Sequence, residues 1–234
     1  MGALTGQTAL VTGASRGIGA ATAEALAALG AHVILTARTA TALETVEDRI
    51  HAAGGSATIA PMDLIDGDSI GRLAVALSQR WDRLDILILN AATLGTLTPV
   101  PAIDGKEFAK LMMLNVTAQQ ALINAFDPML RASANGRVIG LTSSVGAVPR
   151  AFWGAYGASK AAFDTLLGAY AAENRNIGKV CVAIVDPGAT RTEMRAHAFP
   201  GEDPASVKAP EVVGRRIAAL LSEGFESGHR ERVN

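Results

Sequence analysis

Short apolar runs alternate along the chain with longer segments whose apolar positions recur at helical spacing. Six runs are nearly continuous in apolar and β-branched residues: 8–13 (TALVTG), 32–37 (HVILTA), 56–62 (SATIAPM), 84–90 (LDILILN), 136–143 (GRVIGLTS) and 179–186 (KVCVAIVD). Strands that are covered on both faces of a parallel sheet have such sequences. The six runs therefore predict a parallel sheet, with helices in the segments between them.

Signals for helix starts support this alternation. The intervening segments contain the capping-box pairs Thr41 with Glu44 and Asp104 with Glu107, a capping Asp66, and Pro210 in a first helical turn. Because right-handed crossovers join parallel strands, the pattern predicts an α/β fold, a Rossmann-type doubly wound parallel β-sheet of six or seven strands with helices on both faces. The ligand site of such a sheet lies at the carboxyl ends of its strands.

The chain has 234 residues and contains no internal repeat, low-complexity tract or linker. Residues 1–234 are therefore expected to form a single domain. The least regular stretch, residues 189–210, follows the sixth run and is a candidate mobile lid over the ligand site.

Composition excludes several classes of partner. Lys and Arg number 21 against 22 Asp and Glu, so the chain has no basic excess for nucleic acid. No apolar run approaches the roughly 20 residues that span a bilayer, and the N-terminus lacks the pattern of a signal peptide. The single Cys181 cannot form an internal disulfide and is expected to be buried in a strand. We expect a cytoplasmic protein with no nucleic-acid and no membrane partner.

A glycine-rich loop, TGASRGIG at residues 12–19, follows the first strand. Its glycines, Gly13, Gly17 and Gly19, do not have the G-x-G-x-x-G spacing. They still allow the backbone to approach a pyrophosphate, whose charge lies at the N-terminus of the next helix. A plain strand-to-helix turn is the alternative, but the position after the first strand favours a dinucleotide site.

The residues after the second strand indicate which dinucleotide binds. An acid there would bind the 2′-hydroxyl of NAD, but the chain has Ala37 followed by Arg38. Arg38, together with Arg16 in the glycine-rich loop, offers guanidinium donors to a 2′-phosphate. Each arginine could also be a solvated loop charge. Because no acid competes at this position, we predict NADP(H) in preference to NAD(H).

Tyr156 and Lys160 lie four residues apart in AYGASK, so they share one face of a helix. This spacing is compatible with an exposed pair and with a pair that a reaction needs. A phenol has an ordinary pKa of about 10, and a positive charge within about 4 to 6 Å favours the phenolate. We therefore predict that Lys160 lowers the pKa of Tyr156.

Four motifs together are similar to those of a known family. TGASRGIG, Asn115 in LNVTA, Ser143 in LTSSVG, and AYGASK occur in the order and at the separations of that family. The sequence resembles the short-chain dehydrogenase/reductase family, in its compact single-domain branch, from about Gly6 to the last helix. The resemblance implies an NADP(H)-dependent oxidoreductase that interconverts a carbonyl and a hydroxyl group.

The resemblance also implies the catalytic residues Asn115, Ser143, Tyr156 and Lys160. Tyr156 would exchange a proton with the carbonyl oxygen, and Ser143 would hydrogen-bond that oxygen. Lys160 would bind the nicotinamide ribose, and Asn115 would hold a water that links Lys160 to solvent. Taken singly, Tyr156 and Lys160 could be a surface pair. In the same way, Ser143 could be a turn hydroxyl and Asn115 could mark a helix kink.

The cofactor-binding residues that the resemblance implies come from several segments. They are Gly13, Ser15, Arg16, Gly17, Ile18, Gly19, Arg38, Asp63, Leu64, Asn90, Ala91, Tyr156, Lys160, Pro187, Gly188, Thr190 and Thr192. The chain departs from the family at two points. Ala92 stands where the family usually has Gly, and the short C-terminus, SGHRERVN, suggests that the usual last strand and closing tail are truncated.

The expected walls of the substrate pocket are mostly apolar. They comprise Val145, Pro149, Arg150, Phe152, Trp153, Thr93, Leu94, Met194 and Phe199. We therefore predict a small, largely apolar carbonyl or hydroxyl substrate. An NAD(H)-dependent alcohol or hydroxysteroid-like dehydrogenase and a non-catalytic dinucleotide sensor remain alternatives. The alanine-rich helix near Tyr156 predicts a homodimer or homotetramer.

Other catalytic classes lack their sequence signals. The chain has no G-x-S-x-G motif of a serine hydrolase. Its histidines, His32, His51, His197 and His229, show no triad or metal-ligand spacing. We therefore predict no metal site.

Overall fold

The computed structural model describes residues 2–175 and 178–234, which form a seven-stranded sheet that is parallel throughout. Its strands are β1 (Thr8–Thr12), β2 (His32–Thr36), β3 (Ser56–Ile59), β4 (Ile86–Leu89), β5 (Gly136–Leu141), β6 (Val180–Asp186) and β7 (His229–Arg232). They lie in the order β3-β2-β1-β4-β5-β6-β7. The chain reverses direction across the sheet at β1 and β4, which is the doubly wound arrangement that the apolar runs predict.

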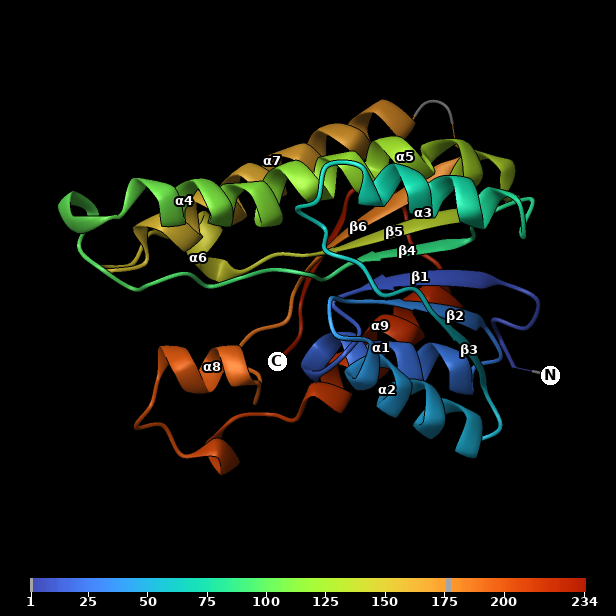
Figure 1. Ribbon diagram of the computed structural model, residues 1–234, viewed down its shortest axis with the longest axis horizontal. Helices are drawn as coiled ribbons and strands as arrows, with labels where there is room; N and C mark the ends of the chain where they lie inside the picture. The colour runs from blue at the N-terminus through green and yellow to red at the C-terminus, as the bar shows by residue number, and fades with distance from the viewer. Residues whose placement is uncertain (1, 176–177) are drawn as a thin grey trace.

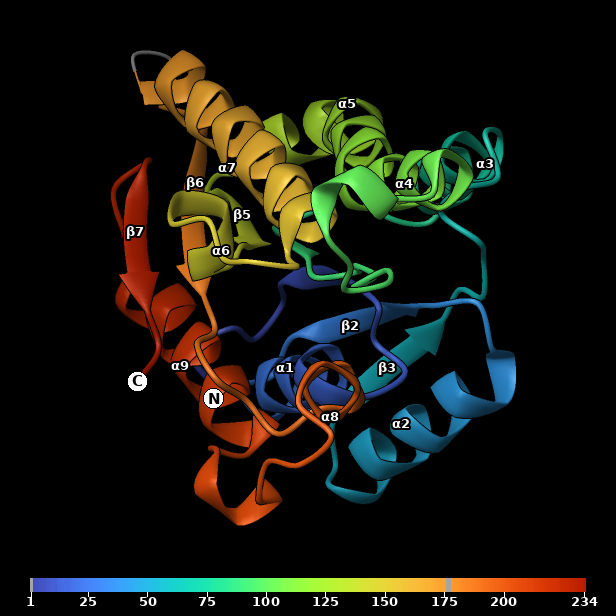
Figure 2. The same cartoon turned by 90° about the vertical axis from the view of Figure 1, so that its left-hand side faces the viewer.

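Helices cover both faces of this sheet (Figures 1 and 2). One layer consists of α1 (Gly17–Ala28), α2 (Ala40–Ala52) and α9 (Pro210–Glu223). The other consists of α3 (Ser69–Ser78), α4 (Gly105–Met112), α5 (Ala118–Ala132) and α7 (Gly154–Arg175). Two short helices, α6 (Ser144–Ala147) and α8 (Glu193–Ala198), lie beyond the carboxyl ends of the strands, on the left of Figure 1.

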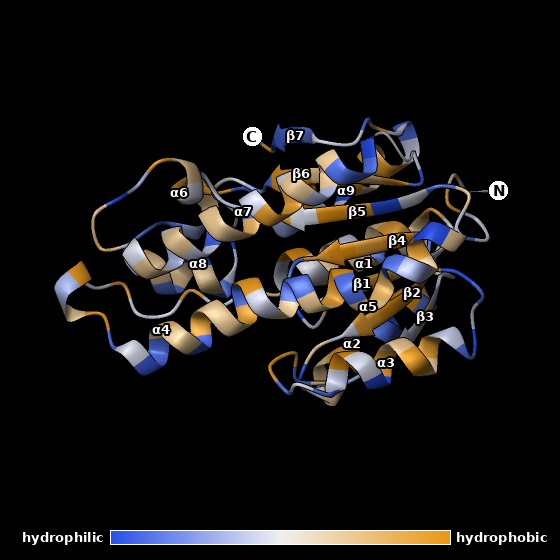
Figure 3. Ribbon diagram, turned by 90° about the horizontal axis from the view of Figure 1, so that it is seen from above, coloured by the Kyte–Doolittle hydropathy of each residue, from blue (hydrophilic) through white to orange (hydrophobic). Residues whose placement is uncertain are grey.

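The alternation of side chains along each strand divides the core into two parts. Ala9 and Val11 of β1 pack with α1, α2 and α9, whereas Leu10 packs with α3, α5 and α7. Because both faces are covered, the inner strands are largely apolar, as Figure 3 shows for β1 and β4, although β5 contains Arg137 and β6 ends at Asp186. Most helices are apolar on the side that packs on the sheet, and α1 is apolar nearly all round.

The seventh strand corrects a prediction from the sequence. The short C-terminus suggested that the last strand is truncated, but His229–Arg232 pair with β6, from Ala183 opposite His229 to Asp186 opposite Arg232. The strand was missed because its sequence, HRER, has no apolar residue. An edge strand with charged side chains is a common protection against pairing with other chains.

The predicted helix starts are correct in two cases and wrong in two. Asp104 caps α4, where its side chain accepts a hydrogen bond from Glu107 N, and Pro210 lies in the first turn of α9. Thr41 is not a cap, because α2 already begins at Ala40. Asp66 is not a cap either, because α3 begins only at Ser69. Local spacing alone did not distinguish the helix boundary from its neighbouring positions.

Residues 189–210, named the lid below, are more regular than the sequence indicates. The two ends of this segment are joined by a backbone hydrogen bond of 2.8 Å from Arg191 N to Lys208 O. Between them lie α8 and a short 3-10 turn at Pro204–Ser206. Arg195 of α8 donates hydrogen bonds of 2.6 and 2.5 Å to Glu202, which lies between α8 and the 3-10 turn. The mobility of the lid remains a prediction.

Cys181 lies in β6 as expected, although it is only partly buried. Within the described ranges, none of the helices combines the length and the apolar character needed to cross a membrane.

Candidate active site

Side chains from six segments meet beyond the carboxyl ends of β1, β4, β5 and β6. The segments are the glycine-rich loop, the turn after β4, the helical turn at Met113–Thr117, the start of α6, the first turns of α7, and the lid. Parallel strands end at one edge of the sheet, so the loops that follow them are neighbours. This edge is the candidate active site.

Tyr156 and Lys160 are buried there, with exposures of 7% and 3%. The Lys160 Nζ donates a 2.8 Å hydrogen bond to the carbonyl oxygen of Leu141, the last residue of β5. It lies 5.7 Å from the centre of the Tyr156 ring. The pair is therefore not an exposed helix pair, and the Lys160 ammonium is held between α7 and the end of the sheet.

Burial shifts the pKa values of both side chains toward their neutral forms. Loss of solvation lowers the pKa of Lys160 to about 8, although the nearby Asp186 carboxylate opposes this change. Burial also raises the pKa of Tyr156 above its ordinary value, and Asp186 raises it further. The net pKa of Tyr156 is thus raised and not lowered as predicted, because desolvation of the phenolate dominates in this geometry.

Asn115 connects α7 to the turn after β4. It is 1% exposed and lies in a wide, π-helical turn at Met113–Thr117. Its Oδ1 accepts from Thr93 N at 2.8 Å, and its Nδ2 donates to Thr93 O at 2.8 Å and to Ser159 Oγ at 3.0 Å. Ser159 in turn donates to the carbonyl oxygen of Tyr156. Asn115 therefore fixes the position of the α7 turn that carries Tyr156.

Ser143 immediately precedes α6 and has extended backbone dihedral angles. Two glycines allow α6 to pack closely on α7: a Cβ on Gly146 would lie 2.9 Å from Ala161 N, and one on Gly157 would lie 3.0 Å from Val145 O. Val145 contacts the apolar cluster of Tyr156. The segment with Ser143 is thereby held beside the turn of α7 that carries the phenol.

The glycines of the loop after β1 serve different purposes. A Cβ on Gly19 would lie 2.2 Å from Gly13 O, and one on Gly13 would lie 2.9 Å from Asn90 Nδ2. The Asn90 amide donates to Thr12 O at 2.8 Å and so joins the ends of β1 and β4. Gly17 is less crowded, but its φ of 56° is a conformation that favours glycine. The loop needs all three glycines to fold.

The N-terminus of α1 fits an anionic group. Arg16 precedes the helix with an extended backbone, no side chain caps the first turn, and the first turn contains no acid. The amide groups at the start of a helix, together with its dipole, bind phosphate in this situation. The two predicted loop residues Ser15 and Ile18 flank this helix start and are partly buried.

The residues predicted to bind the adenosine part of the cofactor also lie at the carboxyl edge of the sheet. Arg38 follows β2 and is exposed, and Arg16 is 71% exposed and pairs with Glu193 of α8 at 2.8 Å. Asp63 follows β3, where its Oδ1 accepts from Ile65 N at 3.2 Å, and its neighbour Leu64 is buried. The arrangement leaves both guanidinium groups accessible to a phosphate.

Both predicted lid hydroxyls take part in folding the chain after β6. Thr190 Oγ1 donates to Pro187 O at 3.0 Å, and Thr192 Oγ1 accepts from Arg195 N as the cap of α8. Gly188 has a φ of 63° at the turn. These contacts hold the Pro187–Gly188 turn and the start of the lid, and each oxygen retains capacity to interact with a ligand.

Five of the predicted pocket residues come together around Tyr156. Leu94, Val145 and Tyr156 form a buried cluster on which Trp153 and Met194 pack. The ring of Phe199 lies 5.6 Å from that of Trp153. The other predicted residues are more peripheral: Pro149, Arg150 and Phe152 are exposed, and Thr93 is bonded to Asn115. The substrate side of the site is therefore apolar.

Ala92, which stands where a glycine was expected, fits without strain. Phe152 is the sole non-glycine residue of the described chain with a positive φ, so Ala92 has an ordinary backbone conformation. Gln119 supports this turn by donating to Ala91 O at 2.9 Å.

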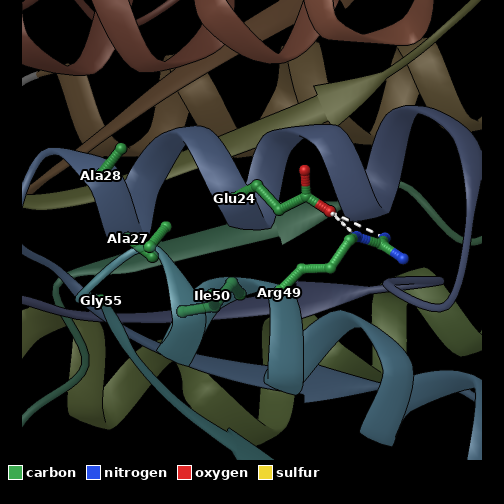
Figure 4. A pocket seen from close by; sticks show the side chains of 7 residues that line it. Glu24, Ala27, Ala28, Arg49, Ile50 and Gly55 are labelled. Atoms are coloured by element: carbon green, nitrogen blue, oxygen red, sulfur yellow. Dashed lines mark hydrogen bonds and ion pairs between the residues drawn. The ribbon is translucent and has the colours of Figure 1, made fainter.

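Figure 4 shows a separate shallow hollow, of about 80 Å³, between α1 and α2. Glu24 and Arg49 form an ion pair of 2.7 Å beside it. The hollow also includes Ala27 and Ala28 at the end of α1 and Gly55 just before β3, so it lies at the amino ends of the strands. It is not part of the site.

The sequence analysis missed two supporting residues, Ser159 and Gln119. Ser159 lies three residues after Tyr156, on the same face of the helix, which was a usable signal. Gln119 had no such signal, because its partners come from two other segments of the chain.

Known proteins similar to this chain are oxidoreductases. Residues 7–203 match the short chain dehydrogenase family. The oxidoreductase YciK of Escherichia coli K12 is 37% identical over 204 residues, which make up 86% of this chain and 80% of that protein.

Solved structures are similar over nearly the whole chain. A short chain dehydrogenase from Pseudomonas syringae has a TM-score of 0.95 at 37% identity. The match covers 99% of this chain and 96% of the Pseudomonas chain. A short chain dehydrogenase from Shigella flexneri 2a, solved in complex with NADP, has a TM-score of 0.93 at 34% identity, with 98% of each chain covered. Since the family match takes in most of the sequence, this protein belongs to the short-chain dehydrogenase/reductase family of oxidoreductases.

Proposed function

We propose that the protein is an NADP(H)-dependent oxidoreductase that interconverts a carbonyl and a hydroxyl group on a small, largely apolar substrate, with Tyr156 as general acid and base. The observation that carries this proposal is the burial of Tyr156 and Lys160 together, with the phenol inside the apolar cluster of Leu94 and Val145. Burial of a phenol and an ammonium lowers the stability of the folded protein. Groups buried at such a cost are found preferentially at functional sites.

The cofactor proposal has three supports. Arg16 and Arg38 supply accessible guanidinium groups where a 2′-phosphate is expected, and the solved Shigella relative is a complex with NADP. The uncapped start of α1 is suited to the pyrophosphate. Residues after β4 and β6, from Asn90 to Ala91 and from Pro187 to Thr192, would hold the adenosine and nicotinamide portions.

In this proposal, side chains of the protein donate the proton and stabilise the groups that take part in its transfer. When bound, NADPH supplies the hydride that is added to the carbonyl carbon. Tyr156 donates its phenolic proton to the carbonyl oxygen, so the carbonyl becomes a hydroxyl, and the phenolate then recovers a proton from solvent. Ser143 donates a hydrogen bond to the same oxygen, in the manner of an oxyanion hole. Lys160 stabilises the transient phenolate with its ammonium charge.

The pKa directions favour carbonyl reduction at neutral pH. A phenol is protonated at neutral pH, and burial raises the pKa of Tyr156 further, so the resting site holds the proton that carbonyl reduction consumes. Alcohol oxidation needs the phenolate as base and is favoured by higher pH. The alcohol or hydroxysteroid-like dehydrogenase is therefore the second candidate. The sensor without chemistry is disfavoured, because it gives no reason to bury Lys160.

Tyr156→Phe tests the role of the phenol. Removal of the proton donor should lower kcat/KM for NADPH-dependent reduction by at least about 100-fold, while NADPH binding is retained. The assay is a panel of apolar ketones and aldehydes with NADPH and NADH. Tyr170→Phe is the matched control, because the chain has two tyrosines and the Tyr170 hydroxyl instead donates to Asp127 at 2.6 Å. Undiminished turnover in Tyr156→Phe would rule out the mechanism.

Arg38→Ala tests the choice of cofactor. Loss of charge-assisted hydrogen bonds to the 2′-phosphate should weaken NADPH binding by about 10- to 100-fold and change NADH binding little. Fluorescence titration of both nucleotides measures the two dissociation constants. Arg131→Ala on α5, which removes an arginine paired with Asp127, is the control. An equal loss for NADPH and NADH would show that Arg38 does not contact the phosphate.

Lys160→Met tests the energetic cost of the buried ammonium. The native pKa of about 8 lies below the ordinary 10.5, so the unfolded chain binds more protons between these pH values. Below pH 8 Lys160 is charged, and burial of this charge lowers the free energy of unfolding of the wild type by its full amount. The variant should therefore be more stable than wild type by about 1 to 3 kcal/mol there, while losing activity. The difference should shrink as pH rises from 8 to 10.5. Urea unfolding across this range measures it; a constant difference would contradict the shifted pKa.

We also propose that the protein assembles as a homodimer or homotetramer through α7. The small residues Ala158, Thr165 and Ala169 are exposed along this helix. Light scattering should give the mass of two or four chains, and Ala169→Arg should lower it by steric and charge repulsion. Ala52→Arg, on the exposed end of α2, should leave the mass unchanged. A monomeric wild type would refute the proposal.

A further inference from the structure

Asp186 is an acidic residue at the catalytic edge that neither the glycine-rich loop nor the catalytic motifs include. It is the last residue of β6, and its side chain is only 16% exposed. Along β6, Val182 and Ile184 face the core beneath α7, whereas Ala183 and Val185 face α1 and α9. Because side chains alternate along a strand, Asp186 points to the side of the sheet that α7 covers.

The carboxylate of Asp186 helps to form the turn that follows β6. Its Oδ1 accepts a 2.9 Å hydrogen bond from Gly188 N and so closes a short loop around Pro187. Its Oδ2 lies 3.8 Å from Arg232 Nε on the neighbouring strand β7. A Cβ on Gly188 would lie 2.9 Å from Lys208 Nζ, which shows how tightly this turn is enclosed.

The same carboxylate lies at the end of the strand next to the one whose last carbonyl binds the Lys160 ammonium. Lys160 donates to the carbonyl oxygen of Leu141, and the register partner of Leu141 is Val185, the residue before Asp186. The charged and titratable groups that face Asp186 come from three elements: Lys160 and Tyr156 from α7, Arg232 from β7, and Lys208 from the segment before α9. Asp186 raises the pKa of both Tyr156 and Lys160.

We propose that Asp186 is a positioning residue of the active site, whose negative charge stabilises the Lys160 ammonium while its Oδ1 holds the Pro187–Gly188 turn. Burial works against the charge on Lys160, and the Asp186 carboxylate partly restores it. Its effect on turnover rests on the proposed function, whereas its effect on Lys160 does not.

Asp186→Asn separates the contribution of the negative charge from that of the hydrogen bond to Gly188 N. The asparagine retains an oxygen that can accept from Gly188 N but removes the charge. Lys160 is followed by NMR titration of the ¹³C-labelled lysine ε-carbons, and its signal is assigned by its loss in Lys160→Met. We expect the pKa of Lys160 to fall from the wild-type value of about 8. A charge at this range and an effective dielectric near 20 predict a fall of about 0.5 to 2.

Glu231→Gln is the matched control. Glu231 is the register partner of Val185, one step from Asp186, but it lies on the opposite face of the sheet, where it binds Arg216 of α9 at 2.6 Å. Its removal should leave the pKa of Lys160 unchanged. Asp186→Glu, which keeps the charge, should retain a Lys160 pKa closer to wild type than Asp186→Asn does, and it provides the comparison if the asparagine variant folds poorly.

Activity supplies a second, separate readout. With a carbonyl substrate from the panel, the alkaline limb of kcat should shift to lower pH in Asp186→Asn by the same amount as the Lys160 pKa. A Lys160 pKa that is equal in wild type and in Asp186→Asn would overturn the proposal. A wild type that reduces no carbonyl compound would instead count against the proposed function, since the NMR titration does not depend on turnover.

Discussion

The Lys160 ammonium is a charge held almost wholly out of water, and the arrangement of the site depends on it. Its Nζ has a hydrogen bond to Leu141 O at the end of β5, and the adjacent strand β6 brings the Asp186 carboxylate to the same place. A buried charge is tolerated only when fixed polar groups replace its solvation. The glycines that let α6 approach α7 complete the enclosure. Sheet register, helix packing and turn geometry therefore all converge on one charged group.

Burial also explains why the site departs from simple charge pairing. The ammonium and the phenol lie 5.7 Å apart from nitrogen to ring centre, yet the pKa of each is shifted toward its neutral form, because desolvation by burial is the largest cause for both. The phenol is protonated near neutral pH and can donate its proton, and the nearby ammonium stabilises the phenolate that remains. The protein gives up stability for this arrangement, as active sites commonly do.

How far the sequence predicts this molecule depends on the range of the interaction involved. The inner strands and the helix cap at Asp104 are predicted correctly, because an apolar run and a capping pair each depend on residues that are close together in the sequence. The strand β7 is missed because a charged edge strand carries no apolar signal. The contacts of Asn115 with Thr93 and Ser159 join three distant segments, and no local pattern encodes them. The pKa shifts depend on burial, which spacing does not report.

The lid shows how the two sides of the site are connected physically. Glu193 of α8 pairs with Arg16 of the glycine-rich loop, while Met194 of the same helix packs on the cluster around Tyr156. The ion pair is largely exposed, with 71% and 68% of the side chains accessible, so it contributes under about 1 kcal/mol. The apolar contacts of this part of the lid are partly buried: Met194 packs beside Tyr156, and the ring of Phe199, at the end of α8, lies tilted against that of Trp153. The lid is therefore held by two independent sets of contacts, and the exposed pair with Arg16 can give way to a phosphate while the apolar contacts near Tyr156 remain.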